Sequence, residues 1–326
     1  MSVKYKHINY YNPYSINENL FIKVYKFLRT GLNDSVFQSY FKHFLGLLFF
    51  RLAFSLVLRG VKFNVVANYK DIVFSARSTN SQFHSIYFKE FSKCYESDVH
   101  AVIDAFLPDN GVFVDIGSNW GHHTFIAAKE KRSTVYSFEP NPMVYGDLKG
   151  IVNSLKLENK IFLNNCAIGQ KKTSLNLVQS GFESGVASIS NKFLKERRYL
   201  VLWPQKFVDL ITFKSSMSYK TKVVVLDEAL GLNRKVDLIK IDAEGAELDC
   251  LFGSIETLKK DKPKVVFEIH SGSGENFIKF LDFFNPLGYK FYLIVPNVAD
   301  SSCAFIPVEK LEPFKQYNIL ASFHEL

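Results

Sequence analysis

The chain has 326 residues, of which 47% are hydrophobic and 15% aromatic, and it carries 40 Lys and Arg against 32 Asp and Glu. These values exclude an intrinsically disordered tail, a collagen-like repeat and a disulfide-stabilised miniprotein. The length suits one large domain with an appendage, or two domains. The four cysteines lie far apart without a C-x-x-C pair, which argues against a zinc site and a disulfide framework.

The positive charge is concentrated at the start of the chain. The first 59 residues contain eight Lys and Arg, and their acidic residues are Glu18 and Asp34. The rest of the chain holds 32 basic and 30 acidic side chains, so it does not favour a nucleic acid as partner. Residues 1–15 are polar and lack the apolar core of a secretory signal. We therefore expect a cytoplasmic protein.

Residues 1–60 are predicted to form a basic, apolar helical extension. Ser15 and Glu18 have the spacing of a capping box, which favours a first helix after Ser15. A second helix is expected to begin near residue 34 and to end at Gly60, because glycine commonly follows a helix C-terminus.

The second of these helices contains a long apolar run, Phe44–Leu58. This run is shorter than the roughly 20 residues of a membrane span, and Arg51 lies in its middle. Three environments are therefore compatible with a helix over residues 35–59. These residues can be buried against the protein or in a homo-oligomer, lie as a peripheral helix on the anionic inner face of a membrane, or cross the membrane.

The chain after this extension is predicted to change from a small β unit to alternating strands and helices. In residues 61–95 two runs, Val61–Val66 and Asp71–Ala76, favour a hairpin or cap. Residues 96–326 show short buried strands separated by helices, which is typical of a mainly parallel sheet. Residues 170–222 interrupt this rhythm and indicate an insertion, a candidate lid over the substrate. The expected strands are Val112–Ile116, Val135–Glu139, Ile161–Asn165, Val236–Ile241, Val265–Ile269 and Tyr289–Val295, with helices near 122–131, 142–156, 245–260 and 275–284.

A glycine turn follows the first of these buried strands. Gly117 lets the backbone approach a ligand, and the N–H groups of the following helix favour a negative group. The spacing from Gly117 to Gly121 is G-x-x-x-G, so the dinucleotide fingerprint G-x-G-x-x-G is absent. Glu139 ends the next strand, where a carboxylate can accept hydrogen bonds from both hydroxyls of a ribose. Taken singly, Gly117 can be an ordinary turn glycine and Glu139 a helix-capping carboxylate.

In combination these features resemble the S-adenosylmethionine-dependent methyltransferases, whose first motif reads D-x-G-x-x-x-G. The sequence is most similar to the FkbM family of O-methyltransferases over about residues 95–300. The resemblance rests on the ordered blocks Val114–Gly121, Phe138–Pro142, Asn165–Gly169, Asp237–Glu247 and Pro263–His270. It implies an α/β protein with a Rossmann-like class I methyltransferase fold, built on a mainly parallel seven-stranded sheet. The α-helical N-terminal extension and the insertion lie outside the resemblance.

The resemblance also implies a role for individual residues, with S-adenosylmethionine as the cofactor. Glu139 would hold the ribose, and Asp242 would lie closest to the sulfonium and the acceptor. His122 and His123 follow the glycine turn, and we expect solvated side chains in the first turn of a helix more readily than substrate contacts. The methionine moiety would be surrounded by Asp115, Gly117, Asn119 and Gly121, and the adenine would lie beside Asn165, Cys166 and Ala167.

The resemblance to this family supports the type of reaction more strongly than it supports the identity of the acceptor. Its members methylate hydroxyl groups, often on sugars or polyketides, and the apolar N-terminus suggests a glycan or a lipid-linked surface polysaccharide. A nucleic-acid amino-methyltransferase would carry an Asn/Asp-Pro-Pro-aromatic tetrapeptide where Asp242-Ala243-Glu244-Gly245 stands. The alternative from another class is a non-catalytic protein that keeps the fold as a docking module on a membrane or complex. The intact Asp115, Glu139 and Asp242 argue against that alternative.

Strand geometry supplies the candidates for proton transfer. Val266, Glu268 and His270 share one face of their strand, and Lys240 and Asp242 share one face of the neighbouring strand. Ligands bind outside the carboxyl ends of such strands, so Asp242, Glu268 and His270 should converge on the acceptor. His270 is the best candidate for the base, with Asp242 or Glu268 to orient it. Two alternatives remain open: a buried Lys240–Glu268 ion pair, and a divalent metal, which the resemblance does not require.

Overall fold

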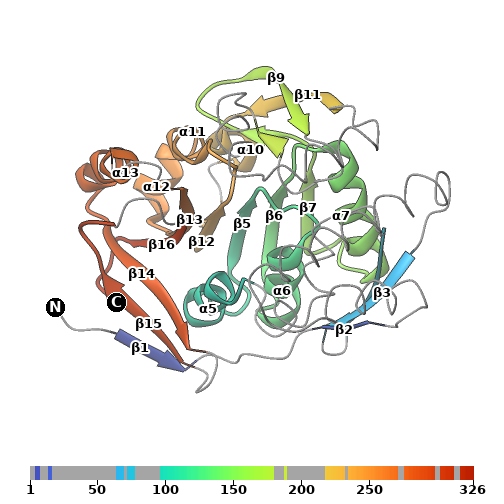
Figure 1. Cartoon of the computed structure of the whole chain (residues 1–326), viewed down its shortest axis with the longest axis horizontal. Helices are drawn as coiled ribbons and strands as arrows, with labels where there is room; N and C mark the ends of the chain where they lie inside the picture. The colour runs from blue at the N-terminus through green and yellow to red at the C-terminus, as the bar shows by residue number, and fades with distance from the viewer. Residues whose placement is uncertain are drawn as a thin grey trace, which may run out of the picture. The chain divides into compact units, whose positions relative to one another are not determined.

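A computed structural model describes residues 4–7, 14–16, 64–69, 72–77, 96–179, 187–188, 217–231, 234–270, 275–297, 302–311 and 316–326. The chain divides into two compact units, which are described separately (Figure 1). The first comprises residues 1–11, 96–177 and 219–326, and the second comprises residues 12–95 and 178–218. Residues 35–59 and the helix expected around them lie outside the described residues. No helix in the described part of the chain is long and apolar enough to cross a membrane.

The first unit contains a nine-stranded sheet in the order β1-β15-β14-β16-β13-β12-β5-β6-β7. The strands β13, β12, β5, β6 and β7 are parallel neighbours, whereas β16, β14, β15 and β1 pair antiparallel. The bounds are β1 Lys4–His7, β5 Val112–Ile116, β6 Thr134–Phe138, β7 Ile161–Asn164, β12 Leu238–Ile241, β13 Lys264–His270, β14 Lys290–Asn297, β15 Ser302–Pro307 and β16 Gln316–Ser322. The predicted α/β class is confirmed, and β1 and β15 extend the expected seven strands at one edge.

The direction of strand order changes between β5 and β12. From β5 the chain continues to β6 and β7 on one side, and it later returns to place β12 and β13 on the other side. In an open α/β sheet, ligands bind at such a switch point, outside the carboxyl ends of the strands. The residues that follow β5 and β12, Gly117 and Asp242, therefore occupy the expected location of a site.

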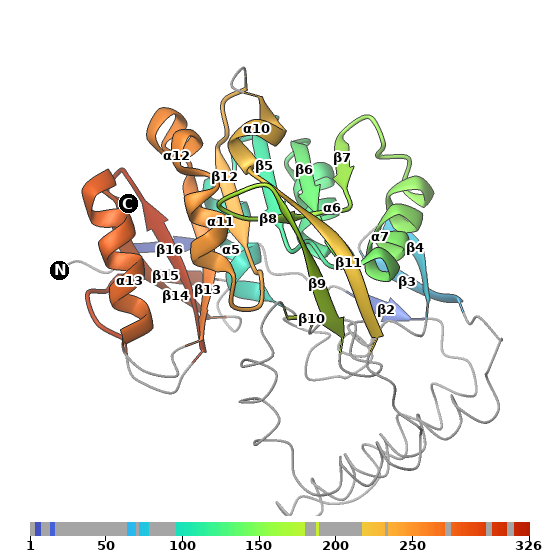
Figure 2. The ribbon, with the colours of Figure 1, turned by 90° about the horizontal axis from the view of Figure 1, so that it is seen from above.

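Helices cover both faces of this sheet (Figures 1 and 2). One face packs Ile239, Val265 and Phe267 against aromatic and aliphatic side chains of α11, α12 and α13. The other face carries Asp115 and Lys240, and α5 and α6 contact it. The bounds are α5 Ser97–Phe106, α6 His122–Glu130, α7 Pro142–Ser154, α10 Leu226–Leu230, α11 Glu247–Phe252, α12 Ile255–Asp261, α13 Glu275–Phe284 and the 3-10 helix η2 Asn285–Leu287.

The expected single helix over residues 245–260 is two helices, α11 and α12. Gly253 ends α11, and a Cβ atom at this position would lie 2.3 Å from the carbonyl oxygen of Gly169. The close approach of another backbone therefore requires glycine here, and the helix breaks at that point. The periodicity of the apolar residues alone does not reveal this contact.

The insertion is partly described. Strands β8 Ala167–Ile168, β9 Thr173–Gln179 and β11 Met217–Val224 belong to a second sheet, in which β11 lies between β9 and β8. The short strand β10 Ala187–Ser188 pairs with the end of β9. The remainder of residues 170–222, and with it the predicted lid, lies outside the described residues.

The second unit contains the predicted hairpin. Strands β3 Asn64–Tyr69 and β4 Ile72–Arg77 pair antiparallel, with Tyr69 opposite Ile72. A third strand, β2 Tyr14–Ile16, pairs with β3, so Ser15 lies in a strand. The prediction that Ser15 caps a helix is wrong, because Ile16, which would be the first helical residue, is also in the strand and pairs with Ala67. The capping-box spacing alone could not anticipate this long-range pairing.

Candidate functional site

The glycine turn after β5 is shaped by the backbone that follows β12. Gly117 has a φ of 72°, and a Cβ atom here would lie 1.8 Å from the carbonyl oxygen of Asp242. The amide of Asp242 donates to the carbonyl of Ile116 at 3.0 Å. Gly117 is therefore required by both its conformation and its neighbour. This contact brings the predicted Gly117 and Asp242 together.

Glu139 connects the glycine turn to the start of α7. One carboxylate oxygen accepts a hydrogen bond from the Asn119 amide at 2.9 Å, and the other accepts from the Asn141 amide at 2.7 Å. The Glu139 side chain is only 7% exposed, and burial raises its pKa to about 7, although both amide bonds oppose the shift. Glu139 thus holds the turn in place, and its remaining lone pairs are available to a ligand.

The residues after β7 lie beside Glu139. The side-chain amide of Asn165 donates to the carbonyl oxygen of Glu139 at 2.8 Å. Cys166 is half-buried, and burial raises the pKa of its thiol. Ala167 is buried at the start of β8. The structure therefore places Asn165 within the predicted donor region, with Cys166 and Ala167 next along the chain.

A buried lysine lies between the two strand ends. Lys240 is 5% exposed, and its ammonium donates to the Gly117 carbonyl at 3.0 Å and to the Asp242 carboxylate at 3.3 Å. It also lies 3.6 Å from the carboxylate of the fully buried Asp115, which accepts from the Thr124 hydroxyl at 2.6 Å. Burial lowers the pKa of Lys240, but Asp242, Asp115 and Glu96 together raise it above its ordinary value. Lys240 is the central cation of this region.

The sequence did not indicate this role for Lys240. Its ion pairs run to Asp115 and Asp242, whereas the sequence had suggested Glu268. Asp115 lies opposite Lys240 in the register of β5 and β12, so the strand alignment explains the contact. The sequence feature that could have indicated the Lys240–Asp242 ion pair is the two-residue spacing, since it places both side chains on one face of the strand.

His122 and His123 are buried, so the expectation that they remain solvated is wrong. The His123 ring is 2% exposed, and its Nε2 atom lies 2.6 Å from the carboxylate of Glu96. Burial lowers the pKa of His123 to about 3, and Lys240 lowers it further while Asp115 opposes the shift. Burial and His123 lower the pKa of His122 as well, and its ring packs 5.5 Å from that of Trp120. The lowered pKa values favour the neutral form of both rings at physiological pH.

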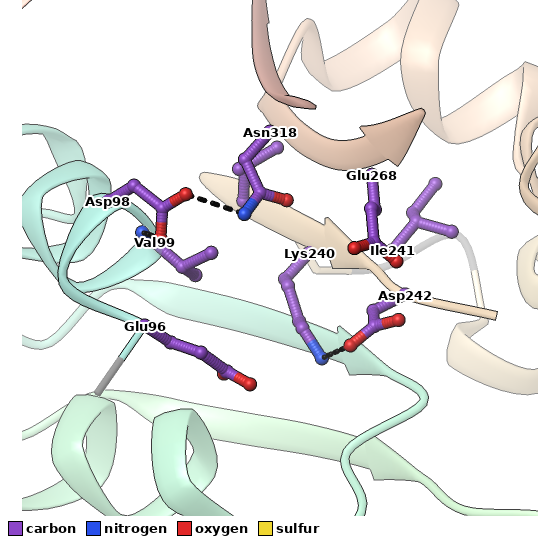
Figure 3. A pocket seen from close by; sticks show the side chains of 9 residues that line it. Glu96, Asp98, Val99, Lys240, Ile241, Asp242, Glu268 and Asn318 are labelled. Carbon is purple, nitrogen blue, oxygen red and sulfur yellow. Dashed lines mark hydrogen bonds and ion pairs between the residues drawn. The ribbon is translucent and has the colours of Figure 1, made fainter. Parts of the chain in front are cut away.

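A cavity of about 270 Å³ lies at the carboxyl ends of β12 and β13 and the N-terminus of α5 (Figure 3). The predicted Asp242 and Glu268 both line it, as does Lys240. His270 ends β13 opposite Gln316, and its side chain lies outside the described residues. The cavity is lined by Glu96, Asp98, Val99, Lys240, Ile241, Asp242, Val266, Glu268 and Asn318.

Three polar residues of the cavity were missed by sequence reasoning. Asn318 from β16 donates to the carboxylate of Asp98 at 2.6 Å, and this carboxylate also accepts from the Val99 amide at 2.9 Å. Burial raises the pKa of Asp98, although both of these bonds lower it. Glu96 precedes α5 and holds His123, as described above. No local motif marks these positions, because they meet only through the tertiary fold.

The loop after β12 is fixed by a buried carboxylate. One oxygen of Glu247 accepts from the amides of Ala243 at 3.1 Å and Gly245 at 3.0 Å. Burial raises the pKa of Glu247, and these backbone bonds oppose the shift. Glu247 thereby holds the loop that carries Asp242, which lines the cavity. Within the described residues, no three His, Cys, Asp or Glu side chains are arranged to hold a metal ion.

Comparison with known proteins places this site in a wider context. A family model for the methyltransferase FkbM domain matches residues 115–291, more than half of the chain. "Methyltransferase 1" of Beauveria bassiana (strain ARSEF 2860) is 28% identical over 166 residues, which cover 49% of this chain and 62% of that protein. The chain therefore spans less than two thirds of this curated relative.

Two solved structures of methyltransferases align with part of this chain. The structure of methyltransferase FkbM from Methylobacillus flagellatus KT aligns with 87% of this chain and 58% of its own, at 15% identity and a TM-score of 0.42. The structure of a TehB-like SAM-dependent methyltransferase from Corynebacterium glutamicum ATCC 13032 Kitasato aligns with 74% of this chain and 94% of its own. Its identity is 9% and its TM-score is 0.40.

Proposed function

Because the chain belongs to the FkbM family of methyltransferases, we propose that it transfers a methyl group from S-adenosylmethionine to a hydroxyl of a sugar. The acceptor sugar would be part of a glycan or a lipid-linked surface polysaccharide. The family match carries the methyltransferase activity, and the site geometry supports the choice of donor. The sugar acceptor follows from the resemblance to family members that methylate hydroxyl groups.

The residues around the glycine turn fit the proposed donor. The side-chain oxygen of Asn119 is buried without a hydrogen-bond partner among the described residues, so it can accept a hydrogen bond from a bound ammonium or hydroxyl. Gly117 and Gly121 both have a positive φ, which glycine adopts without strain, and Glu139 offers carboxylate oxygens nearby. Asp115, Gly117, Asn119 and Gly121 would therefore surround the methionine moiety, Glu139 would bind the ribose, and Asn165, Cys166 and Ala167 would border the adenine.

The acceptor is proposed to enter the cavity beside Asp242. When bound, the donor supplies an electrophilic methyl group on a positively charged sulfur. A sugar hydroxyl attacks that carbon most readily as its proton departs, and a positioned base contributes typically about 10²–10⁴-fold. His270 would take this proton, and Asp242 and Glu268 would orient the base or the acceptor. Asp242 and Glu268 line the same cavity, which supports this assignment.

The donor site is tested by titrating the purified full chain with S-adenosylhomocysteine, the product of methyl transfer, in a calorimeter. We expect Glu139→Ala to weaken binding by about 1.5–3 kcal/mol for each charge-assisted hydrogen bond lost. Glu158→Ala serves as the matched control, because Glu158 is an exposed glutamate outside the site. Unchanged affinity of Glu139→Ala would contradict the donor assignment, and a wild-type chain that does not bind would favour the non-catalytic alternative.

The base is tested by the turnover of His270→Ala, with donor affinity measured in parallel. We expect at least a tenfold loss of turnover at unchanged affinity, in keeping with the usual contribution of a general base. A smaller loss would exclude His270 and transfer the role to Asp242. Inhibition of the wild-type enzyme by a chelator would instead indicate a metal-dependent reaction. Mass spectrometry of surface glycans, compared between strains with and without the protein, identifies the acceptor.

The N-terminal extension supports a second, separate part of the proposal, which is association with an anionic membrane surface. Its basic excess and the apolar run Phe44–Leu58 suit a peripheral helix attracted to acidic lipids. We expect the full chain to float with phosphatidylserine vesicles but not with phosphatidylcholine vesicles, and to dissociate at high salt. Failure to float, together with a dimeric mass in solution, would assign residues 35–59 to a homo-oligomer.

A further inference from the structure

A buried lysine needs partners that compensate for the loss of water. The Lys240 ammonium meets a carbonyl and two carboxylates: Gly117 at 3.0 Å, Asp242 at 3.3 Å and Asp115 at 3.6 Å. Removal of a charge from water costs several kcal/mol, so these contacts oppose that cost. The partners have different locations, because Gly117 belongs to the proposed donor turn whereas Asp242 lines the proposed acceptor cavity.

A purely structural role does not account for this arrangement well. Buried ion pairs are often replaced by apolar side chains at little cost to stability, so stability alone is a weak reason for a lysine at this position. In addition, Lys240 itself lines the cavity, and its ammonium points toward Asp242 there (Figure 3). The cation therefore lies at the junction of two functional regions and not within the apolar core.

Other charged groups surround this junction. Glu96, which precedes α5, raises the pKa of Lys240, and Glu268 from β13 lines the same cavity. His123 from α6 is neutral, as its lowered pKa requires. Lys240 is thus the cation among the charged side chains that line the described cavity, and it faces carboxylates from β5, from the residue before α5 and from the residue after β12.

We propose that Lys240 is a positioning residue for methyl transfer, whose single ammonium fixes both the Gly117 turn at the donor and the Asp242 carboxylate at the acceptor. This inference rests on the proposed function, because it assigns the two sides of the lysine to the two substrates. The positive charge is the essential property. An apolar side chain of the same length fills the space but leaves the Gly117 carbonyl without its donor and leaves Asp115 and Asp242 without a shared cation.

The test compares Lys240→Met, which keeps the length of the side chain, with Lys240→Arg, which keeps the charge. The position borders the cavity. Binding of S-adenosylhomocysteine to the full chain is measured by calorimetry, and thermal unfolding is measured in parallel. We expect Lys240→Met to weaken binding about tenfold or more and Lys240→Arg to restore most of the affinity. Lys259→Met, in an exposed helical pair, is the matched control and should bind as the wild type does.

The possible outcomes separate this inference from the proposed function. If the wild type does not bind, the donor assignment and the inference that rests on it both fail. If the wild type binds and Lys240→Met binds equally well, or better than Lys240→Arg, the lysine fills space and the inference alone is overturned. If Lys240→Met does not fold, binding of S-adenosylhomocysteine is measured for two other proteins. They are the single variant Asp242→Asn and the double variant that combines Asp242→Asn with Lys240→Met. The double variant is expected to bind about tenfold more weakly, and equal binding would overturn the inference.

Discussion

The proposed donor turn, called the donor turn below, and the proposed acceptor cavity are built in different ways. The donor turn comes from residues 115–139. Glu139 holds much of it together, because its carboxylate accepts hydrogen bonds from backbone amides. The residues that line the cavity lie far apart in the sequence, from Glu96 to Asn318, and α5, β12, β13 and β16 bring them together. Hydrogen bonds between side chains, such as the one from Asn318 to Asp98, hold them in place. The comparison teaches that the turn depends on hydrogen bonds and close approaches of the backbone, which include the backbone after β12, whereas the cavity depends on contacts between side chains of distant elements. Substitutions should therefore affect the two regions differently.

The largest expected effect comes from adding a methyl group at the donor turn. Gly117→Ala forces a Cβ atom into the space held by the Asp242 carbonyl, at a backbone conformation that alanine disfavours. We expect a loss of about 3 kcal/mol or more in the free energy of unfolding, at the upper end of overpacking effects. Chemical denaturation measures this loss. The control is Gly150→Ala on α7, where nothing lies within 4 Å of the new methyl group.

The control variant should show the opposite sign. Alanine is favoured over glycine inside a helix by up to about 1 kcal/mol, so Gly150→Ala should stabilise the protein slightly. If both glycine variants were equally stable, the close approach of Gly117 and Asp242 would not exist in solution. The switch point of the sheet would then lack the geometry on which the donor turn depends.

The next effect is a pH dependence carried by Glu139. Its pKa is about 7 in the folded chain and near 4.5 when unfolded, so folding favours the protonated form. The stabilising contribution is therefore complete below about pH 4.5 and is lost as the pH rises through about 7. Relative to Glu139→Gln, the wild type should lose on the order of 3 kcal/mol of unfolding free energy over this range.

This pH dependence is measured by denaturation of both proteins at several pH values. Subtracting the Glu139→Gln curve from the wild-type curve removes the contributions of Asp98 and Glu247, whose pKa values are also raised. The same subtraction with Glu158→Gln, at an exposed position, should give a flat line. A flat difference for Glu139 as well would mean that water reaches its carboxylate in the folded protein.

The smallest effect is expected at the acceptor cavity. Asn318→Ala removes the donor that holds Asp98, and a partly buried hydrogen bond to a charged group is worth about 1–3 kcal/mol. Because the donor turn does not depend on this bond, affinity for S-adenosylhomocysteine should stay within a factor of two of the wild type. The control Asn153→Ala, on the exposed side of α7, should change neither quantity. Weakened donor binding in Asn318→Ala would show that the two regions are coupled.

The donor turn could be predicted from sequence because its signals are local. The strand Val112–Ile116 was placed at its observed bounds, and the resemblance to a methyltransferase family is confirmed by the family match. A buried strand, a glycine turn and an acidic strand end lie within one short segment. Each can be recognised from its immediate neighbours, since strand burial and turn chemistry are properties of adjacent residues.

The rest of the site could not be predicted because it depends on tertiary contacts. The burial of His122 and His123 follows from the packing of α5 on α6, and the partners of Lys240 follow from the register of β5 and β12. Asn318 reaches Asp98 across 220 positions of sequence. Hydrophobic periodicity indicates which face of an element is buried, but not which polar group of a distant element will meet it.

The position of β16 has a consequence for the order of folding. This strand follows β14 and β15 in the chain, yet it lies between β13 and β14 and pairs antiparallel with both. The hairpin of β14 and β15 therefore cannot join the parallel strands until β16 has entered the space between them. Such non-local pairing slows folding, because loop-closure entropy is lost before the contacts form. A ribosome that pauses before residue 316 would thus present β13 as an open edge, and the cavity that Asn318 lines would not form before β16 arrives.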